Sequence, residues 1–434
     1  LVIMRPLASH LRLPRGGTPP AWLRSADART AALLHAALSF ALLSGSCLHA
    51  PAAVAYTPFS EEQRLAAEAW KLTDKEYVDR EFNGQDWFMT RQRMVAQKYT
   101  EKEEVYGEIR KMLGSLGDKY TRFLTPAMYD AVFSVATGDV AGMGVELQAY
   151  PREGAEGEPP PTDVTVNSVI EGSPAEKAGL KAGDILEEVD GQAIRSLSAE
   201  EAAARVRGPV GSKLRIVVSR PGEAEPITKV IERASVKLEG VTSLGVSSVD
   251  GVKVGVVRVK QFSTTTSADV SAALQGLQKK NAQVLVLDLR GNTGGYFTGG
   301  IDVARLFLPN EAIINYVTDK KLNTVTYRTY EDGAYLTQPL YILVDGGTAS
   351  ASEILASALQ DNGRAKLVGK QTFGKAVIQT VERLSDGSAV VVTIARYETP
   401  KHTNINKQGI MPDIAKDCPA ATPAVECLPR PLRG

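Results

Sequence analysis

The best candidates for catalysis in this sequence are a serine and a lysine, because histidine is nearly absent where it would be needed. The 434 residues contain four histidines, at His10, His35, His49 and His402. Hydrolases of the Ser-His and Cys-His types need a histidine as proton shuttle. If an N-terminal segment is removed, only His402 remains, in a polar stretch typical of an exposed loop. We therefore expect another residue type to act as the base.

Ser350 is the candidate nucleophile, since it lies between two alanines where an apolar run ends and a helical pattern begins. Backbone N–H groups at a helix start favour negative charge nearby. Ordinary helix capping is, however, the commoner reason for a serine at such a position. The residues alone also do not choose among Thr348, Ser350 and Ser352, although residues two apart on a helix point in nearly opposite directions.

Lys375 is the candidate base, and it lies between Gly374 and Ala376 beside Phe373. Most lysines are solvated surface charges. A lysine buried in apolar surroundings has a lowered pKa instead, and its neutral amine can accept the proton of a serine. With histidine so scarce, Lys375 is the strongest base candidate in the chain.

A glycine-rich loop follows the apolar run 284–287 and contains Gly294 and Gly295. It lacks both the Gly-Lys-Ser/Thr ending of a P-loop and the G-x-G-x-x-G order of a dinucleotide site. Its backbone N–H groups can stabilise an oxyanion. A phosphate cradle and a plain structural turn remain open as alternatives at this point.

These candidates fall in a segment, residues 237–417, whose pattern alternates between strands and helices. Strands are predicted at 252–259, 284–287, 340–344, 377–381 and 389–394, with helices at 268–280 and 349–360. This alternation predicts a layered α/β core. The pair Asp386-Gly387 indicates a hairpin turn before the last strand.

Residues 138–236 form a different module of short strands with a single helix, and the segment resembles a PDZ domain. Its most specific motifs are Gly179-Leu-x-x-Gly-Asp184 and Val189-Asp-Gly191. The resemblance implies that a loop binds a peptide's terminal carboxylate through backbone N–H groups, while the peptide adds a strand. The predicted loop residues are Gly142, Met143, Gly144 and Val145. A β-rich domain without peptide binding is the alternative.

Upstream of that module, residues 56–137 are predicted to form a helical domain, and residues 1–55 a two-part targeting segment. The leader has five arginines against one acid in its first thirty residues, then an apolar stretch, 31–43, and Ala53-Val-Ala55. An Arg-rich leader followed by a signal-like core and a small-x-small site predicts import into an organelle and passage across an internal membrane. The chloroplast thylakoid lumen fits this plan best, with a membrane-tethered N-terminus as the alternative.

Composition excludes some other classes of protein. Lys plus Arg equals Asp plus Glu, 50 against 50, so no basic surface for a nucleic acid is expected. The three cysteines lack the spacing of a zinc site, and no metal is expected. Cys418 and Cys427 lie in the C-terminal tail, 418–434, where a disulfide and two free thiols are equally good readings.

Several motifs together resemble the carboxyl-terminal processing peptidases, in that family's order, from about residue 60 to 415. The motifs are Asp118-x-Tyr-Thr-Arg-Phe-Leu124, Asp288-Leu-Arg290, Gly294-Gly295, Ser350-Ala-Ser-Glu-Ile354, Gln360-Asp-x-x-Arg-Ala365, Val368-Gly369, Thr372-Phe-Gly-Lys375 and Gly409-Ile-x-Pro-Asp413. Two positions depart from the usual pattern: Asp345 stands where Asn is more common, and Ala376 where Gly is. Neither change removes a chemical group.

The resemblance implies a multidomain α/β protein with a crotonase/ClpP-like catalytic core and a role for each matching residue. Ser350 is the implied nucleophile and Lys375 the general base. Gln379 orients the lysine and Asp361 supports the site. The implied oxyanion donors are the N–H of Ala351 and one from Gly294 or Gly295, and no cofactor is needed.

Within the family, the lumenal chloroplast branch is the nearest in pattern. That branch implies a protein substrate with a free C-terminus, the photosystem II reaction-centre precursor. It also implies that the enzyme is a monomer and contacts the thylakoid membrane only transiently, when it binds this membrane-embedded substrate. The alternatives are a tail-specific housekeeping peptidase, a catalytically silent PDZ scaffold, and an acyl-CoA binder of related architecture, for which no nucleotide motif is visible.

Overall fold

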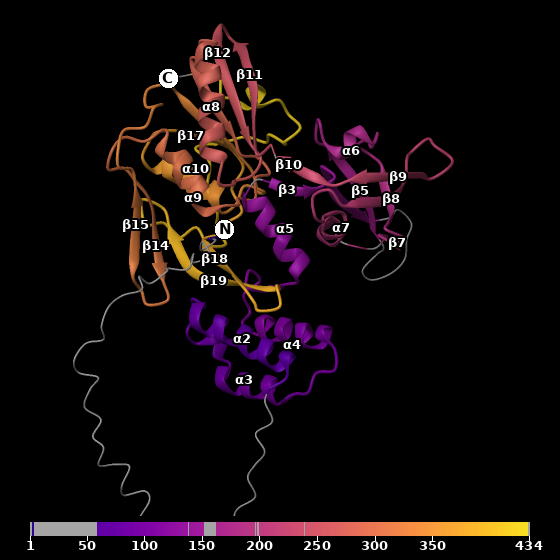
Figure 1. Ribbon diagram of the computed structural model, residues 1–434. Helices are drawn as coiled ribbons and strands as arrows, with labels where there is room; N and C mark the ends of the chain where they lie inside the picture. Colours follow the sequence, from indigo (N-terminus) through magenta and orange to yellow (C-terminus); the bar gives the residue numbers. More distant parts are fainter. Residues whose placement is uncertain are drawn as a thin grey trace, which may run out of the picture. The chain divides into compact units, whose positions relative to one another are not determined.

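The computed structural model describes residues 2–3, 59–137, 139–151, 162–195, 197, 199–237 and 239–432 (Figure 1). The predicted targeting segment lies outside these residues, apart from the two-residue strand β1 (Val2–Ile3), which pairs with strand β18 (Val377–Arg383). No helix in the described part is long and apolar enough to span a bilayer.

The N-terminal region is helical, as its sequence pattern predicts. Three helices, α2 (Glu61–Glu76), α3 (Trp87–Ala96) and α4 (Lys102–Gly114), pack around a shared apolar core. Asp86 caps α3 by accepting a hydrogen bond from the Met89 N–H. A 3₁₀ turn η2 (Phe82–Gly84), strand β2 (Arg122–Leu124) and helix α5 (Pro126–Thr137) complete the region.

The inserted module has the strands and single long helix expected of a PDZ domain. Its five main strands pair in the order β4-β5-β6-β8-β9 around the buried core that includes Met143 and Leu186. The elements are β4 (Val145–Pro151), β5 (Thr162–Val169), α6 (Pro174–Lys177), β6 (Ile185–Val189), β7 (Gln192–Ala193), α7 (Ala199–Val206), β8 (Lys213–Ser219) and β9 (Ile227–Glu232). Strands β3 (Asp139–Gly142) and β10 (Ala234–Lys237) pair at its entry and exit.

The α/β core contains a six-stranded sheet that is parallel except at one edge. The order is β11-β12-β13-β16-β17-β20, with only β11 antiparallel to its neighbour. The strands are β11 (Val241–Val249), β12 (Val252–Val259), β13 (Val284–Asp288), β16 (Leu340–Val344), β17 (Lys366–Gly369) and β20 (Ile414–Ala415). Helices α8 (Thr266–Lys279), α9 (Phe297–Arg305) and α10 (Ala351–Asp361) pack in the main hydrophobic core. A 3₁₀ turn η3 (Ala424–Cys427) follows near the C-terminus.

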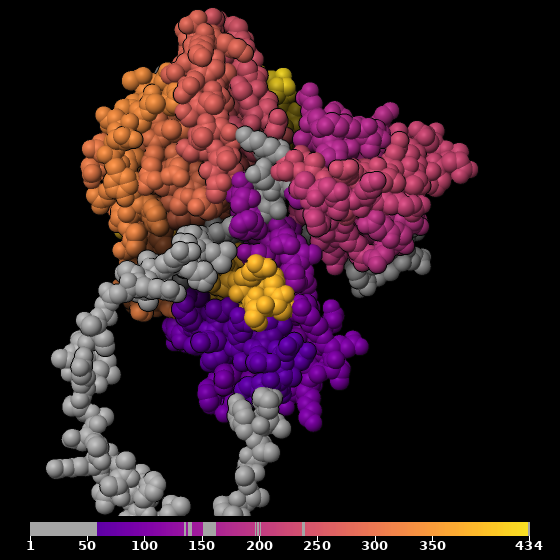
Figure 2. Space-filling view, in the orientation of Figure 1, coloured from indigo at the N-terminus to yellow at the C-terminus, as the bar shows by residue number. Residues whose placement is uncertain are grey.

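A second sheet carries the segment after Lys375. It contains β14 (Ile313–Asp319), β15 (Thr324–Arg328), β18 (Val377–Arg383) and β19 (Ala389–Glu398), joined by β2 of the helical region. The predicted hairpin turn at Asp386-Gly387 is confirmed, and its tip lies against the helices, where the orange-yellow turn meets the indigo surface in Figure 2. Asp386 accepts from the Tyr106 hydroxyl at 2.6 Å and pairs with Lys102 at 2.9 Å.

Candidate active site

The turn between β16 and α10 singles out Ser350 among the three hydroxyls that the sequence left open. Thr348 donates its hydroxyl to the Leu289 carbonyl at 2.9 Å, and Ser352 donates to the Asn292 carbonyl at 3.0 Å. The Ser350 hydroxyl is fully buried and has no hydrogen-bond partner within the described part of the chain. Among the described residues, the Ser350 hydroxyl therefore makes no hydrogen bond that caps the helix or stabilises the turn.

Ser350 also has an unusual backbone conformation, with φ +64° and ψ −118°. L-residues rarely adopt this region, and holding one there costs about 1–3 kcal/mol unless the surroundings fix it. Strain of this kind at the junction of a strand and a helix turns the serine hydroxyl out of the helix.

Glu353 provides hydrogen bonds that hold the Ser350 backbone in this conformation. It is a functional residue that sequence reasoning missed. One carboxylate oxygen accepts from the Ser350 N–H at 2.8 Å and the Lys375 N–H at 2.9 Å. The other accepts from the Thr372 hydroxyl at 2.6 Å and the Gly374 N–H at 2.7 Å. A buried carboxylate thus joins the backbones of the two candidate catalytic residues. The Ser-x-x-Glu spacing of a capping box was the available signal.

Lys375 has the electrostatic setting that its predicted role requires. Burial lowers the pKa of its amine, and the nearby Arg122 guanidinium acts in the same direction, while Asp118 and Glu353 oppose the shift. The ammonium lies 4.6 Å from the centre of the Tyr120 ring, a cation–π contact that favours the charged form. Since the Ser350 hydroxyl is unpaired, the amine is not hydrogen-bonded to it in this conformation.

Gln379 is buried in β18, four residues after the lysine. The amide donates to the Thr393 hydroxyl at 3.2 Å. Thr393 in turn donates to Asp118 at 2.5 Å, and Thr121 donates to the same carboxylate at 2.7 Å. Asp118 therefore links the helical region to β19, the strand that pairs with β18.

The glycine-rich loop lies directly against the Ser350 turn, as an oxyanion site requires. A Cβ added at Gly294 would be 2.7 Å from the Cβ of Ser350, and one at Gly295 would be 2.1 Å from the Phe262 carbonyl oxygen. The Gly294 N–H donates to the Asn292 side chain at 2.9 Å. The N–H groups of Gly295 and Ala351 have no hydrogen-bond acceptor among the described residues, so they are the free donors of this loop.

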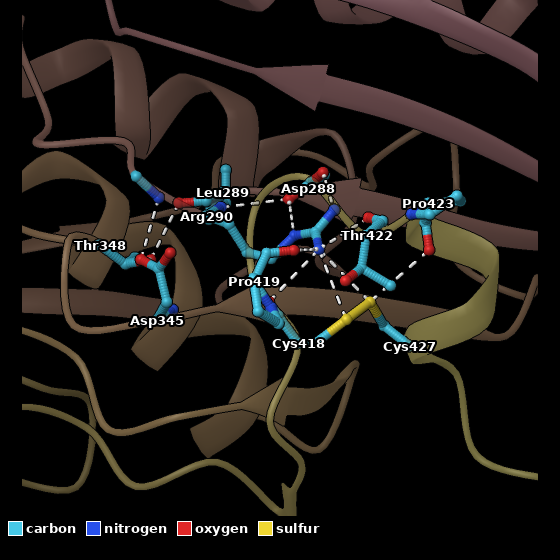
Figure 3. A network of polar contacts seen from close by, with 11 residues as sticks. Asp288, Leu289, Arg290, Asp345, Thr348, Cys418, Pro419, Thr422, Pro423 and Cys427 are labelled. Atoms are coloured by element: carbon cyan, nitrogen blue, oxygen red, sulfur yellow. Dashed lines mark hydrogen bonds and ion pairs between the residues drawn. A yellow bond between two sulfur atoms is a disulfide. The ribbon is translucent and has the colours of Figure 1, made fainter.

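Behind this loop, Arg290 and a disulfide form the network shown in Figure 3. The buried guanidinium pairs with Asp288 at 2.7 Å and donates to the Pro419 carbonyl at 2.7 Å and the Thr422 carbonyl at 3.0 Å. Cys418 and Cys427 are bonded, which settles the question that the sequence left open. The C-terminal loop that the disulfide closes thus provides acceptors for a cation one residue before the glycine-rich loop.

Asp361 lies at the end of α10, away from the reacting groups. Its carboxylate accepts from the Thr399 hydroxyl at 2.7 Å and the Lys401 N–H at 3.1 Å. It therefore holds the turn that follows β19 rather than contacting Ser350 or Lys375 itself.

The predicted carboxylate-binding loop of the PDZ module is held in place by hydrogen bonds to its backbone carbonyls. The Met143 carbonyl accepts from the Ala175 N–H at 2.8 Å and the Gly144 carbonyl from the Ile170 N–H at 3.0 Å. Gly144 has φ +82°, and a Cβ there would lie 2.4 Å from the Cβ of Ser173. The N–H groups of Met143 and Gly144 have no acceptor among the described residues, leaving them available to a peptide terminus.

An α/β core with a buried, unpaired serine beside a desolvated lysine, together with a PDZ module, is the architecture of a PDZ-containing serine peptidase. The model of "Peptidase family S41" matches residues 253–416 and that of the "PDZ domain" matches residues 165–220. The chain belongs to peptidase family S41, as a C-terminal processing serine peptidase. The predicted family and fold class are thereby confirmed.

Named relatives align with more than four fifths of this chain. A carboxyl-terminal-processing protease of Synechocystis sp. is 40% identical over 380 residues, which is 87% of this chain and 86% of the relative. The chloroplastic carboxyl-terminal-processing peptidase 2 of Arabidopsis thaliana is 39% identical over 358 residues, 82% of this chain and 68% of the relative. A solved photosystem II D1 C-terminal processing protease is 37% identical with a TM-score of 0.57, covering 82% of this chain and 94% of that one.

The described residues hold no group of three or more His, Cys, Asp or Glu side chains arranged to bind a metal ion. The only histidine among them, His402, stacks on Tyr316 and pairs with Glu398 on the surface.

Proposed function

We propose that this peptidase cleaves its substrate with Ser350 as nucleophile and Lys375 as general base. The observation that carries the proposal is the Ser350 hydroxyl, which is buried and unpaired in a turn where both neighbouring hydroxyls are committed to structure. The lowered pKa of Lys375 increases the fraction of its amine that is neutral and can accept a proton.

In the first half of the reaction, the neutral amine takes the hydroxyl proton while the oxygen attacks the scissile carbonyl. The N–H groups of Gly295 and Ala351 stabilise the resulting oxyanion. The lysine ammonium then returns the proton to the leaving amine, which releases the C-terminal fragment and leaves an acyl-serine ester. Water, deprotonated by the same lysine, hydrolyses that ester and restores the free enzyme.

Because the Lys375 ammonium lies on the Tyr120 ring, the amine must turn from the ring to the Ser350 hydroxyl before the first proton transfer. Hydrogen bonds between catalytic groups commonly tighten only when substrate binds. We place this reorientation at the moment when the substrate chain enters the site, with its C-terminus bound at residues 142–145 of the PDZ module.

We further propose that the substrate is the C-terminally extended precursor of a photosystem II reaction-centre protein, cleaved in the chloroplast thylakoid lumen. The Arabidopsis thaliana relative above and one from Tetradesmus obliquus, 37% identical over 386 residues, are named as chloroplastic. A solved relative is named for photosystem II D1. The leader pattern of residues 1–55 points independently to the same compartment.

The test is to incubate the full chain with a peptide that ends in such an extension and to locate the cut by mass spectrometry. Ser350→Ala and Lys375→Met should fold normally and show no turnover, whereas Ser357→Ala, a buried serine on the same helix, should remain active. Turnover in either of the first two variants would refute the catalytic assignment. Equal cleavage of unrelated unfolded proteins would instead identify a housekeeping peptidase.

The role of the PDZ loop is tested with the same peptide carrying a C-terminal amide. Loss of the terminal carboxylate should raise KM with little change in kcat, since only binding energy common to ground and transition states is removed. An unchanged KM would show that the loop does not bind the terminus.

A further inference from the structure

Tyr397, on strand β19, contacts the backbone of both proposed catalytic residues through one hydroxyl. The hydroxyl donates to the Lys375 carbonyl at 2.6 Å and lies 3.2 Å from the Ser350 carbonyl oxygen. The side chain is 1% exposed and is among the largest fully buried side chains of the described residues. Burial, together with the charge of Glu353, raises the pKa of this phenol well above its ordinary value, so it stays a hydrogen-bond donor at working pH.

Glu353 and Tyr397 hold the same two residues, Ser350 and Lys375, through the peptide groups on their two sides. The Glu353 carboxylate accepts the N–H groups of Ser350 and Lys375, and the Tyr397 hydroxyl meets their carbonyls. Ser350 and Lys375, which are 25 positions apart in the sequence, are therefore linked through both their backbone N–H groups and their backbone carbonyls. No other side chain of the described residues has recorded hydrogen bonds to the carbonyls of both.

The two carbonyls depend on the hydroxyl to different degrees. The Ser350 carbonyl also accepts the N–H groups of Glu353 at 2.9 Å and Ile354 at 3.0 Å, in the first turn of α10. For the Lys375 carbonyl, the Tyr397 hydroxyl is the one hydrogen-bond donor recorded among the described residues. Loss of the hydroxyl would thus free the Lys375 carbonyl and leave that residue held by its N–H on Glu353 alone, while the Ser350 carbonyl keeps its two backbone donors.

We propose that Tyr397 is a positioning residue, which sets the separation between Ser350 and Lys375 by binding the backbone of the base to that of the nucleophile. The inference rests on the proposed roles of those two residues and adds a third residue to the reaction. Its chemistry requires no proton transfer by the phenol, because the hydroxyl only holds the lysine carbonyl in place. Misplacing a catalytic group by about 1 Å can reduce a rate by about a hundredfold.

The test compares Tyr397→Phe with Tyr335→Phe in the full chain. Both tyrosines are buried, and each substitution removes only a hydroxyl that donates to a carbonyl, that of Ser271 in the control. We expect Tyr397→Phe to lower kcat by about ten- to a hundredfold with KM within twofold. Ser350 should also react more slowly with a serine-directed sulfonyl fluoride. The control should retain kcat, although both variants lose similar stability in denaturant unfolding.

Equal kcat in the two variants would overturn the inference, and so would a rise in KM at constant kcat, since that pattern belongs to a substrate contact. A fall in kcat matched by partial unfolding of Tyr397→Phe alone would also overturn it in favour of a purely structural role. Failure of the proposed function looks different: Ser350→Ala or Lys375→Met would then keep turnover, whatever Tyr397→Phe does.

Discussion

The proposed nucleophile and the proposed base of this peptidase are held in contrasting ways. The Ser350 turn is buried and fixed on every side by hydrogen bonds from the core, including those of Glu353. The backbone of Lys375 shares that anchor, but its amine lies over the Tyr120 ring, on the segment 118–122 that enters from the helical region. The serine side of the pair is preorganised, and the lysine side depends on a second module.

This difference indicates where the enzyme can be controlled. A turn with a strained backbone and many buried bonds has one arrangement, since any change leaves polar groups unsatisfied. A lysine side chain in contact with a ring on another module can exchange partners at small cost. We infer that the rate of the first proton transfer is set on the lysine side, and that damage to the serine side abolishes the site altogether.

The largest effect is expected from Glu353, the centre of the fixed side. Glu353→Ala leaves four buried donors without an acceptor, and each costs about 1–3 kcal/mol, so we expect little folded protein. Glu353→Gln preserves the volume, but its NH₂ group must face two N–H or O–H donors. We expect it to fold with kcat lowered at least a hundredfold.

The matched control is Glu382→Gln, on β18, whose carboxylate accepts only the Thr380 hydroxyl among its recorded bonds. Turnover and urea unfolding of the two Gln variants would be measured side by side. Near-normal kcat in Glu353→Gln would contradict the view that the serine side has a single arrangement.

A smaller effect is expected from reducing the Cys418–Cys427 disulfide, which supports the fixed side from behind. Opening a loop of this size lowers the free energy of unfolding by about 2–3 kcal/mol. The carbonyls that bind Arg290 belong to that loop, so the oxyanion loop should loosen and kcat should fall several-fold with KM unchanged.

The measurement is activity and unfolding with and without dithiothreitol. A Cys418→Ser, Cys427→Ser double variant, already lacking the bond, should be insensitive to the reductant. A kcat that dithiothreitol leaves unchanged would show that the C-terminal loop does not influence the oxyanion site.

Some parts of the site and of the fold could be predicted from the sequence, and others could not. Ser350 and Lys375 were singled out by the scarcity of histidine, by the glycine-rich loop and by the ordered family motifs, since each residue alone is more simply explained by helix capping or by solvation. Strands β14 and β15 and helix α9 were not predicted. The two strands have mixed polarity without a clear period, and the short helix α9 contains two adjacent glycines, which are poor helix formers.

Contacts across the fold were beyond local reasoning. Tyr397 looks like any residue of an apolar strand, and its role depends on a hydroxyl meeting carbonyls 22 and 47 positions away. Asp361 was matched by motif, yet what it holds became visible only in the folded chain. The predicted roles of Ser350, Lys375 and Gln379, and the domain boundaries, stay predictions.

The smallest effect, and the sharpest test of the adjustable side, concerns Tyr120. The ring stabilises the charged form of Lys375 and so raises the pKa of its amine, against the larger lowering by burial. Tyr120→Leu keeps the site apolar but removes the ring, so the pKa should fall further. Since the neutral amine is the active form, activity rises with pH through this pKa, and its midpoint should move to lower pH. A cation–π contact is worth about 0.5–1 kcal/mol at exposed sites, so the expected displacement of the midpoint is small.

The control is Tyr330→Leu, which removes a ring stacked on Arg305 at a surface site remote in sequence from the pair. The pH profile of kcat/KM would be recorded for both variants over the range in which the enzyme stays folded. A midpoint that does not move, or moves to higher pH, would mean that the ring does not hold the ammonium in the working enzyme. Lys375 would then be as preorganised as Ser350, and its amine would not need to reorient when the substrate binds.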